Sequence, residues 1–195
     1  MIEKKVYVGF PLKDSEVLRY AGVKKADKET LELLEECKRE LLCEYSLTVC
    51  FSVFDVCIDG QICDFGNFCI RSRDLAKLLK DSSKALVFGA TAGHELDRMI
   101  MKYSRLSPSK ALMFQAVGTE IVESGSDAFL SDISKENGFD FTPRFSAGYG
   151  DLPLSFQKDI FTYLDLTKRN GMYLNESLIM SPSKSVTAIV GIKNK

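Results

Sequence analysis

The feature that most constrains the fold is one short apolar run, Ala85-Leu86-Val87-Phe88-Gly89-Ala90-Thr91. An apolar run of this length, ended here by Gly93, is typical of a buried strand. A buried strand has to lie within a sheet that other elements cover. The rest of the chain must therefore supply neighbouring strands and the helices that cover them.

One strand and two helices are predicted at the start of the chain. Lys5 to Phe10 alternates apolar and polar residues, as strands do, and Pro11 ends it. A short helix is expected from Asp14 to Ala21, before Gly22. Asp27 suits the N-cap of a longer helix, because its side chain can accept hydrogen bonds from the free N–H groups of the first turn. The apolar residues of that helix recur at spacings of three and four: Leu34, Cys37, Leu41 and Tyr45.

A β-hairpin is predicted between that helix and the buried run. Residues 47–58 are rich in Val, Phe, Thr and Cys, which favours a strand. The dipeptide Asp59-Gly60 is a favoured hairpin turn, and it leads the chain back into residues 61–65. A further helix is expected to begin at Ser72 or Arg73.

The second half of the chain predicts two more helices directly after the buried run. Residues 94–103 have helical spacing. Ser107-Pro108 suits the N-cap and first position of a long helix that runs past Glu123. Glycine in a helix costs about 1 kcal/mol against alanine, so small residues in its middle indicate close packing or a bound ligand. These small residues are Ala116, Gly118, Ser124, Gly125 and Ser126.

The C-terminal part predicts one helix and two strands. Residues 155–167 form an amphipathic pattern, which Asn170-Gly171 closes. Strands are expected near residues 174–180 and 186–192, with 181–184 as the turn. Because helices and hairpins mix without strict alternation, the order favours an α+β fold, a twisted and mainly antiparallel sheet flanked by helices. With no repeat or linker in 195 residues, we expect residues 1–195 to form a single domain.

Composition excludes several classes of protein. The net charge is −1 and the basic residues are scattered, whereas nucleic-acid binding needs a concentrated positive face. No window approaches the ~18 apolar residues that span a bilayer. The N-terminal apolar segment is too short for the core of a signal peptide, so a cytoplasmic protein is expected.

Six cysteines occupy one stretch, and their spacing decides how they are interpreted. Zinc and iron–sulfur sites usually draw ligands from close pairs such as C-x-x-C, and here neighbours are six or seven residues apart. Reduced cysteines used as small apolar residues are therefore the favoured interpretation, and a cluster or redox role is the alternative. The six are Cys37, Cys43, Cys50, Cys57, Cys63 and Cys69.

The glycine-rich segment 89–95 lies where phosphate-binding loops occur. A phosphate loop needs Lys-Ser/Thr after its second glycine, and His94-Glu95 stand there instead. A tight strand-to-helix turn is the better interpretation. His94 is the only histidine, so a turn or capping role is favoured over general base catalysis.

The segment from Arg144 to Pro153 carries the most chemistry. An arginine beside irregular backbone is suited to grip a carboxylate through its fork of donors. Gly148 lets backbone approach a ligand closely. Tyr149 offers a flat apolar face and a hydroxyl beside a sulfonium or an adenine. An aromatic loop closing over the core is the alternative.

The order of these features resembles the activation domain of cobalamin-dependent methionine synthase. The R-x-x-x-G-Y pattern at 144–149 is followed by a helix and by G-M-x-L-x-E-S-x-x-M-x-P at 171–182. Residues 85–97 look like the family's strand, turn and acidic helix start, and the helix with residues 116–123 looks like its ligand-side helix. The resemblance covers roughly residues 84–192, and we expect residues 1–83 to belong to the same domain.

The resemblance implies a site for S-adenosylmethionine. In the family the arginine holds the methionine carboxylate and the backbone after it meets the adenosine, roles that fall on Arg144 and Phe145. Gly148 and Tyr149 then line the pocket. Glu123 best matches the family's acidic residue, which faces the cationic end of the ligand.

The family's chemistry is the repair of an oxidised corrinoid. An electron from flavodoxin or a similar donor and a methyl group from S-adenosylmethionine restore methylcobalamin from cob(II)alamin. The domain positions the methyl donor, so no side chain is expected to act as an acid or base. Cobalamin would come only through a partner, a separate cobalamin-dependent methionine synthase or another corrinoid protein.

Three departures from the family keep a second function open. Gly150-Asp151-Leu152-Pro153 replaces Pro-Ala-Cys-Pro and a downstream histidine. The family's C-terminal aromatic contact is missing from the sequence. Its cobalamin and substrate domains are missing too. The alternative is a non-catalytic partner of a corrinoid protein that kept the fold and lost the ligand.

Overall fold

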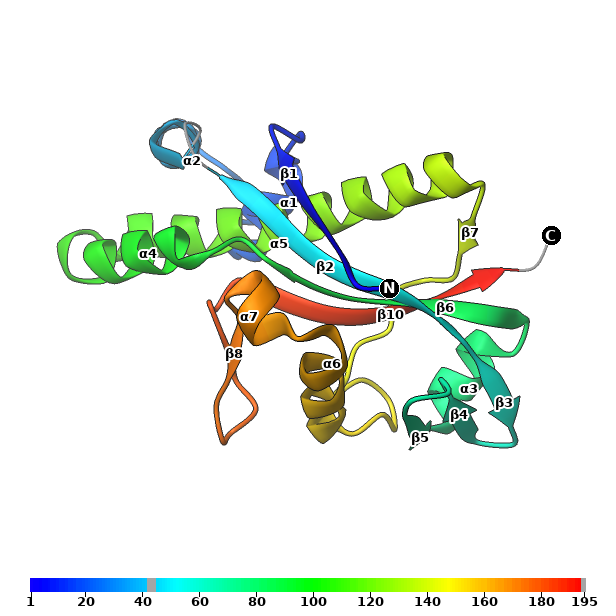
Figure 1. The fold of residues 1–195 in the computed structure, drawn as a ribbon. Coiled ribbons are helices and arrows are strands. Elements are labelled where there is room, and N and C mark those ends of the chain that lie inside the picture. Colours follow the sequence, from blue (N-terminus) through cyan, green and yellow to red (C-terminus); the bar gives the residue numbers. More distant parts are fainter. Residues whose placement is uncertain (42–44, 194–195) are drawn as a thin grey trace.

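A five-stranded antiparallel sheet forms the centre of the structure (Figure 1). The computed structural model describes residues 1–41 and 45–193, so Cys43 lies outside the described residues. Every strand pair of the sheet is antiparallel, which confirms the predicted α+β fold. From one edge to the other the strands are β1 (Glu3–Val8), β2 (Ser46–Asp55), β6 (Ser82–Thr91), β10 (Ser185–Lys193) and β7 (Asp140–Phe141).

The predicted buried strand is the central strand β6. All of residues 85–91 are buried, and β6 pairs with β2 on one side and β10 on the other. Alternation sends Leu86 and Phe88 into a core on one face of the sheet and Val87 into a core on the other. The sheet therefore has two covered faces.

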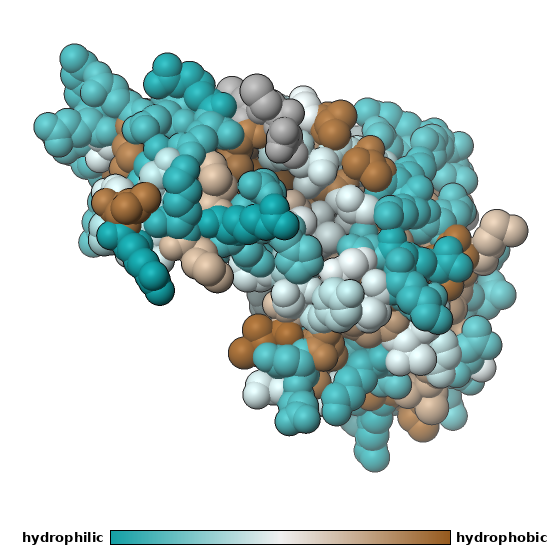
Figure 2. Space-filling model, turned by 60° about the vertical axis from the view of Figure 1, so that its left-hand side comes forward, coloured by the Kyte–Doolittle hydropathy of each residue, from teal (hydrophilic) through white to brown (hydrophobic). Residues whose placement is uncertain are grey.

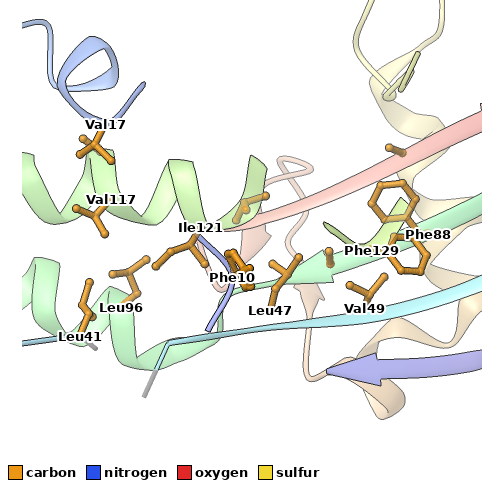
Figure 3. Packing of buried hydrophobic residues seen from close by; sticks show 14 of the residues in the cluster. Phe10, Val17, Leu41, Leu47, Val49, Phe88, Leu96, Val117, Ile121 and Phe129 are labelled. Carbon is orange, nitrogen blue, oxygen red and sulfur yellow. The ribbon is translucent and has the colours of Figure 1, made fainter. Parts of the chain in front are cut away.

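Four helices pack on the first face, where Phe88 meets Phe129 at a ring-centroid distance of 5.3 Å (Figure 3). The longest, α5, has 30 residues and spans ~45 Å. Its small residues permit close packing, as predicted, because a Cβ on Gly125 would lie 2.7 Å from a methyl carbon of Leu47. The helices are α1 (Asp14–Tyr20), α2 (Lys28–Leu41), α4 (His94–Leu106) and α5 (Pro108–Asn137).

Shorter elements cover the second face. A three-stranded sheet contains the predicted hairpin, which turns at Gly60 in the left-handed region. A second, two-stranded hairpin lies beside the last helix. The elements are β3 (Cys57–Asp59), β4 (Ile62–Asp64), β5 (Cys69–Arg71), α3 (Arg73–Leu79), η1 (Leu154–Phe156), α6 (Gln157–Leu164), α7 (Leu166–Asn170), β8 (Tyr173–Leu174) and β9 (Met180–Ser181).

Two predicted elements of the C-terminal half are wrong in extent. The helix expected over 155–167 is divided into η1, α6 and α7. Asp165 separates α6 from α7, because its left-handed φ of 48° ends α6. The strand expected over 174–180 is strand only at its ends. Between them Asn175 closes a turn by accepting the N–H of Ile179 at 2.9 Å, and Leu178 has a φ of 62°.

In the N-terminal half, the strand expected over 5–10 is Glu3–Val8, and the strand expected over 47–58 divides at Val56 into β2 and β3. Asp27 accepts the N–H of Thr30 at 2.9 Å and so caps α2 as expected. Tyr45 was expected to continue the apolar stripe of α2 but lies beyond its end, where its hydroxyl donates to the Phe10 carbonyl at 2.6 Å. In the described ranges, no helix is both long and apolar enough to cross a bilayer.

The described cysteines divide into two groups. Cys37, Cys50 and Cys63 are buried, as small apolar residues are, and burial raises the pKa of the Cys63 thiol to about 11. Cys57 and Cys69 are exposed on the three-stranded sheet. Within residues 1–41 and 45–193, no three His, Cys, Asp or Glu side chains gather as metal ligands would.

Candidate functional site

A cavity of about 420 Å³ lies at the edge of β10. Small-molecule sites commonly have volumes of roughly 300–1,000 Å³. We call it the Arg144 pocket. It is lined by Glu123, Arg144, Phe145, Ser146, Ala147, Tyr149, Gln157, Met180, Val186, Thr187 and Ala188.

The pocket exists because β10 is only partly covered along this edge. β7 pairs with β10 at Ile192 and Lys193, and a single bridge then joins Phe145 to Ile189. In that bridge the N–H of Phe145 donates to the Ile189 carbonyl at 2.9 Å, and the reverse bond is 2.8 Å. Past the bridge the chain turns away at Ala147, so residues 186–188 of β10 border the cavity.

Arg144 is the charged centre of the pocket. Its guanidinium lies 2.6 Å from a carboxylate oxygen of Glu123 and 3.2 Å from one of Asp127. Both carboxylates come from α5 at positions i and i+4, so they share one face of the helix. The Arg144 side chain is 24% exposed and Glu123 is 42% exposed. A polar ligand in the cavity can therefore reach both charges.

The Gly148-Tyr149 turn forms one wall of the pocket. Gly148 has a φ of 91°, a conformation that L side chains rarely adopt, and its N–H donates to the Leu152 carbonyl at 2.9 Å. Ala147 and Leu152 are buried and anchor both ends of the turn. Tyr149 itself is 68% exposed. Its ring therefore borders the pocket without closing it.

Asp151 attaches this turn to the start of α3. One carboxylate oxygen accepts the Ser72 hydroxyl at 2.6 Å and the N–H of Asp74 at 3.1 Å, and the other accepts the N–H of Arg73 at 2.8 Å. The hydrogen bond from Ser72, with those from the α3 backbone, lowers the pKa of Asp151. The residue that departs from the family pattern is therefore a structural anchor of the pocket wall.

The inner end of the pocket is polar but uncharged. Thr187 is 1% exposed and Gln157 is 5% exposed. Among the described residues, neither the Thr187 hydroxyl oxygen nor the Gln157 amide oxygen has a hydrogen-bond partner. A buried polar atom left unpaired costs about 1–3 kcal/mol, so native proteins keep few of them.

The structure gathers the residues that the sequence singled out. Arg144, Phe145, Tyr149 and Glu123 line the pocket, and Gly148 forms the turn beside it. Arg144 and Glu123, expected at opposite ends of a ligand, are paired with each other. Which part of a ligand each residue contacts stays a prediction.

Sequence reasoning missed three polar residues of this region. Asp127 had a usable signal, because it lies one helical turn after Glu123. Thr187 also had one, since it is a polar residue inside the apolar strand 186–192. Gln157 had none, because a glutamine in the first turn of an amphipathic helix is ordinarily exposed.

Other motifs lie away from the pocket lining. The segment 89–95 forms the predicted turn from β6 to α4, and His94 is the exposed first residue of α4. Glu176 and Ser177 are exposed at the tip of the β8–β9 hairpin. Only Met180, at the base of that hairpin, reaches the pocket.

Comparisons with known proteins bear on the fold. No family model matches the sequence, and no curated protein matches it. Among solved structures, the crystal structure of the MetH reactivation domain bound to AdoHcy is similar, with a TM-score of 0.72 and 13% sequence identity. The match covers 98% of this chain and 78% of that chain. This chain therefore has the fold of the activation domain of methionine synthase.

Proposed function

We propose that this chain binds S-adenosylmethionine in the Arg144 pocket. The carrying observation is the position of Arg144, between two carboxylates and at the wall of a cavity of about 420 Å³. A guanidinium is suited to a ligand carboxylate, and a carboxylate to an ammonium or sulfonium. The similar MetH domain was crystallised with AdoHcy, which shares the amino-acid and adenosine parts of S-adenosylmethionine.

The Arg144–Glu123 pair offers a route by which a zwitterion enters. The ligand carboxylate takes the place of Glu123 at the guanidinium, and Glu123 then faces the ligand's positive charge. The number of opposite-charge contacts does not fall in this exchange, so desolvation is offset on both sides. Asp127 stays within reach of Arg144 and keeps the guanidinium oriented.

We further propose that the chain is an activation subunit. It would support reductive remethylation of cob(II)alamin held by a separate cobalamin-dependent methionine synthase, with a flavodoxin-like protein as electron donor. The pocket residues named above bind and orient the methyl donor, and no acid or base is required of them. Cobalamin supplies the nucleophile when the partner presents it.

Titration calorimetry with S-adenosylmethionine tests the proposed site. We expect the wild type to bind and Arg144→Ala to lose roughly 100-fold in affinity, because charge-assisted hydrogen bonds to the carboxylate disappear. Arg98→Ala is the matched control. Arg98 forms an exposed 2.9 Å ion pair with Glu95 on α4, outside the pocket lining, and its removal should leave affinity unchanged.

The outcomes separate the two candidate functions. Failure of the wild type to bind S-adenosylmethionine, with a corrinoid partner present, would refute the proposed site. Capture of a corrinoid protein together with unchanged function in Arg144→Ala would favour the non-catalytic partner instead. Methylation of cob(II)alamin on a methionine synthase lacking its own activation domain, dependent on this chain and on Arg144, would support the activation subunit.

A further inference from the structure

Two unpaired polar atoms mark the inner end of the Arg144 pocket. Of five buried side-chain atoms without partners in the described residues, the Gln157 amide oxygen and the Thr187 hydroxyl line this one cavity. They come from different elements, since Thr187 lies on β10 and Gln157 begins α6. Folding has brought two unsatisfied hydrogen-bonding groups to the wall of the same cavity, which is the arrangement of a binding surface.

These two groups lie on the opposite side of the sheet edge from the ion pairs. Thr187 shares a face of β10 with Ile189, whose core includes Ile160 and Leu164 of α6. Glu123 and Asp127 come from α5, which covers the other face and packs on Ala188. The pocket thus has a charged end at α5 and a neutral polar end at α6.

The neutral end excludes some ligand groups and selects others. An amide oxygen accepts a hydrogen bond, and a threonine hydroxyl both donates and accepts. A purely apolar group placed there would leave both unpaired, whereas hydroxyl and amino groups without charge would satisfy them. A free amino acid would occupy only the charged end of the pocket and would leave Gln157 and Thr187 without hydrogen-bond partners.

We propose that Gln157 and Thr187 bind the nucleoside half of the ligand and make the pocket selective for adenosyl compounds over free amino acids. This inference rests on the proposed S-adenosylmethionine site. It adds two residues that bind the uncharged nucleoside half of the ligand. The ribose hydroxyls and the adenine amino group are the ligand groups with the required chemistry.

Near-isosteric variants test the inference by calorimetry. Thr187→Val and Gln157→Met should each weaken S-adenosylhomocysteine binding roughly 5- to 10-fold, because one neutral hydrogen bond is lost. Each should weaken adenosine binding by a similar factor. Arg144→Ala should weaken S-adenosylhomocysteine binding but not adenosine binding, since adenosine has no carboxylate.

The thermal stability of the ligand-free protein gives a second test, because Tm should rise in a variant whose ligand affinity falls. Removing an unpaired buried hydroxyl should raise the Tm of Thr187→Val by ~1–4 °C while ligand affinity falls. Ser82→Ala is the matched control, because Ser82 also has a buried unpaired hydroxyl but does not line the pocket. It should raise the Tm and leave affinity unchanged.

The results distinguish this inference from the proposed function. Binding of S-adenosylhomocysteine that both variants leave unchanged would overturn the inference and spare the proposed site. A lower Tm in Thr187→Val would also overturn it, since the hydroxyl would then be paired in the folded protein. Adenosine binding that depends on Thr187, without any binding of S-adenosylmethionine, would keep the inference and refute the proposed function. A wild type that binds none of these compounds refutes both.

Discussion

Lys110 and Arg144 each lie between two carboxylates, and their surroundings differ. Lys110, at the start of α5, contacts Glu36 at 2.7 Å and Glu40 at 2.8 Å. Arg144 contacts Glu123 at 2.6 Å and Asp127 at 3.2 Å. The Lys110 side chain is 9% exposed and lies 4.3 Å from the centre of the Tyr103 ring. Arg144 is 24% exposed and borders a cavity.

The difference bears on which ion-pair cluster a ligand can reach. The Lys110 cluster joins α2 to α5, and the Tyr103 ring covers its ammonium, so it holds two helices together. In both clusters the two carboxylates belong to one helix. The Lys110 cation belongs to a second helix, whereas the Arg144 cation comes from an irregular segment at an open sheet edge. A ligand carboxylate could therefore replace Glu123 at Arg144 without separating two packed helices. Each cluster has a carboxylate at a cavity, since Glu40 lines one of about 290 Å³ and Glu123 lines the Arg144 pocket. Of the two cations, it is Arg144 that lines a cavity, which favours its cluster as the candidate site.

Charge reversal should separate the two clusters most strongly. Glu123→Lys puts a cation beside Arg144 and beside the positive end of the ligand, and we expect S-adenosylmethionine affinity to fall more than ~100-fold. The matched change Glu36→Lys repels Lys110 and should lower stability with no effect on affinity. Calorimetry and denaturant unfolding of both variants make the comparison, and equal affinities for the two would contradict it.

Removal of the buried cation should affect stability alone. Lys110→Met keeps the length of the side chain and loses two charge-assisted contacts, so the free energy of unfolding should fall by about 2 kcal/mol. The affinity for S-adenosylmethionine should match the wild type. A denaturant titration measures the free energy of unfolding. An unchanged midpoint would show that the Lys110 cluster does not stabilise the contact between α2 and α5.

The anchor of the pocket wall should respond to pH. Because hydrogen bonds lower the pKa of folded Asp151 below its ordinary value of 3.8, its stabilisation is present above that pH and disappears as pH falls through the lowered value. Asp151→Asn should therefore be less stable than the wild type at pH 7, and the gap should close below pH 3.8. Asp81→Asn is the control, since the Asp81 side chain is exposed and its ion pair with Lys80 is 3.7 Å long. A gap that does not change with pH would argue against the anchor.

Thiol labelling tests the comparison locally, at Cys37, and its expected effect is the smallest of those described. Cys37 is buried, its sulfur lies 4.0 Å from the Lys110 carbonyl, and burial raises its pKa to about 12. In a variant with Cys43, Cys57 and Cys69 changed to serine, Cys37 should label slowly at pH 8. Loss of the Lys110 charge by itself raises the pKa of Cys37 further, so faster labelling in Lys110→Met would report looser packing of α2 on α5. We expect that acceleration in Lys110→Met and none in Arg144→Ala. Equal acceleration by both would mean that the two clusters are coupled.

The surface of the molecule carries exposed apolar residues outside both clusters. The face in Figure 2 is mostly hydrophilic, with small separate hydrophobic patches. Near the pocket, Tyr149 is 68% exposed and Ile179 on the β8–β9 hairpin is 63% exposed. Single exposed apolar residues of this kind are ordinary on protein surfaces.

Local features of the chain were predictable because their causes are local. The apolar run at 85–91, the Asp27 cap and the Asp59-Gly60 turn each depend on residues close in sequence, and each appears in the structure. The breaks at Asp165 and Leu178 were missed because left-handed backbone at a non-glycine residue depends on tertiary contacts more than on composition.

The sequence by itself determined most of the elements and the α+β class, and it singled out Arg144 and Glu123 as candidate ligand-binding residues. Only the tertiary structure decided that β10 lies between β6 and a partly covered edge, and that Arg144 meets Asp127 there. It alone placed Gln157 and Thr187 in the same cavity. Periodicity reports which face of an element is buried, whereas a pocket forms where several elements fail to cover one another. That outcome depends on contacts between residues far apart in the chain.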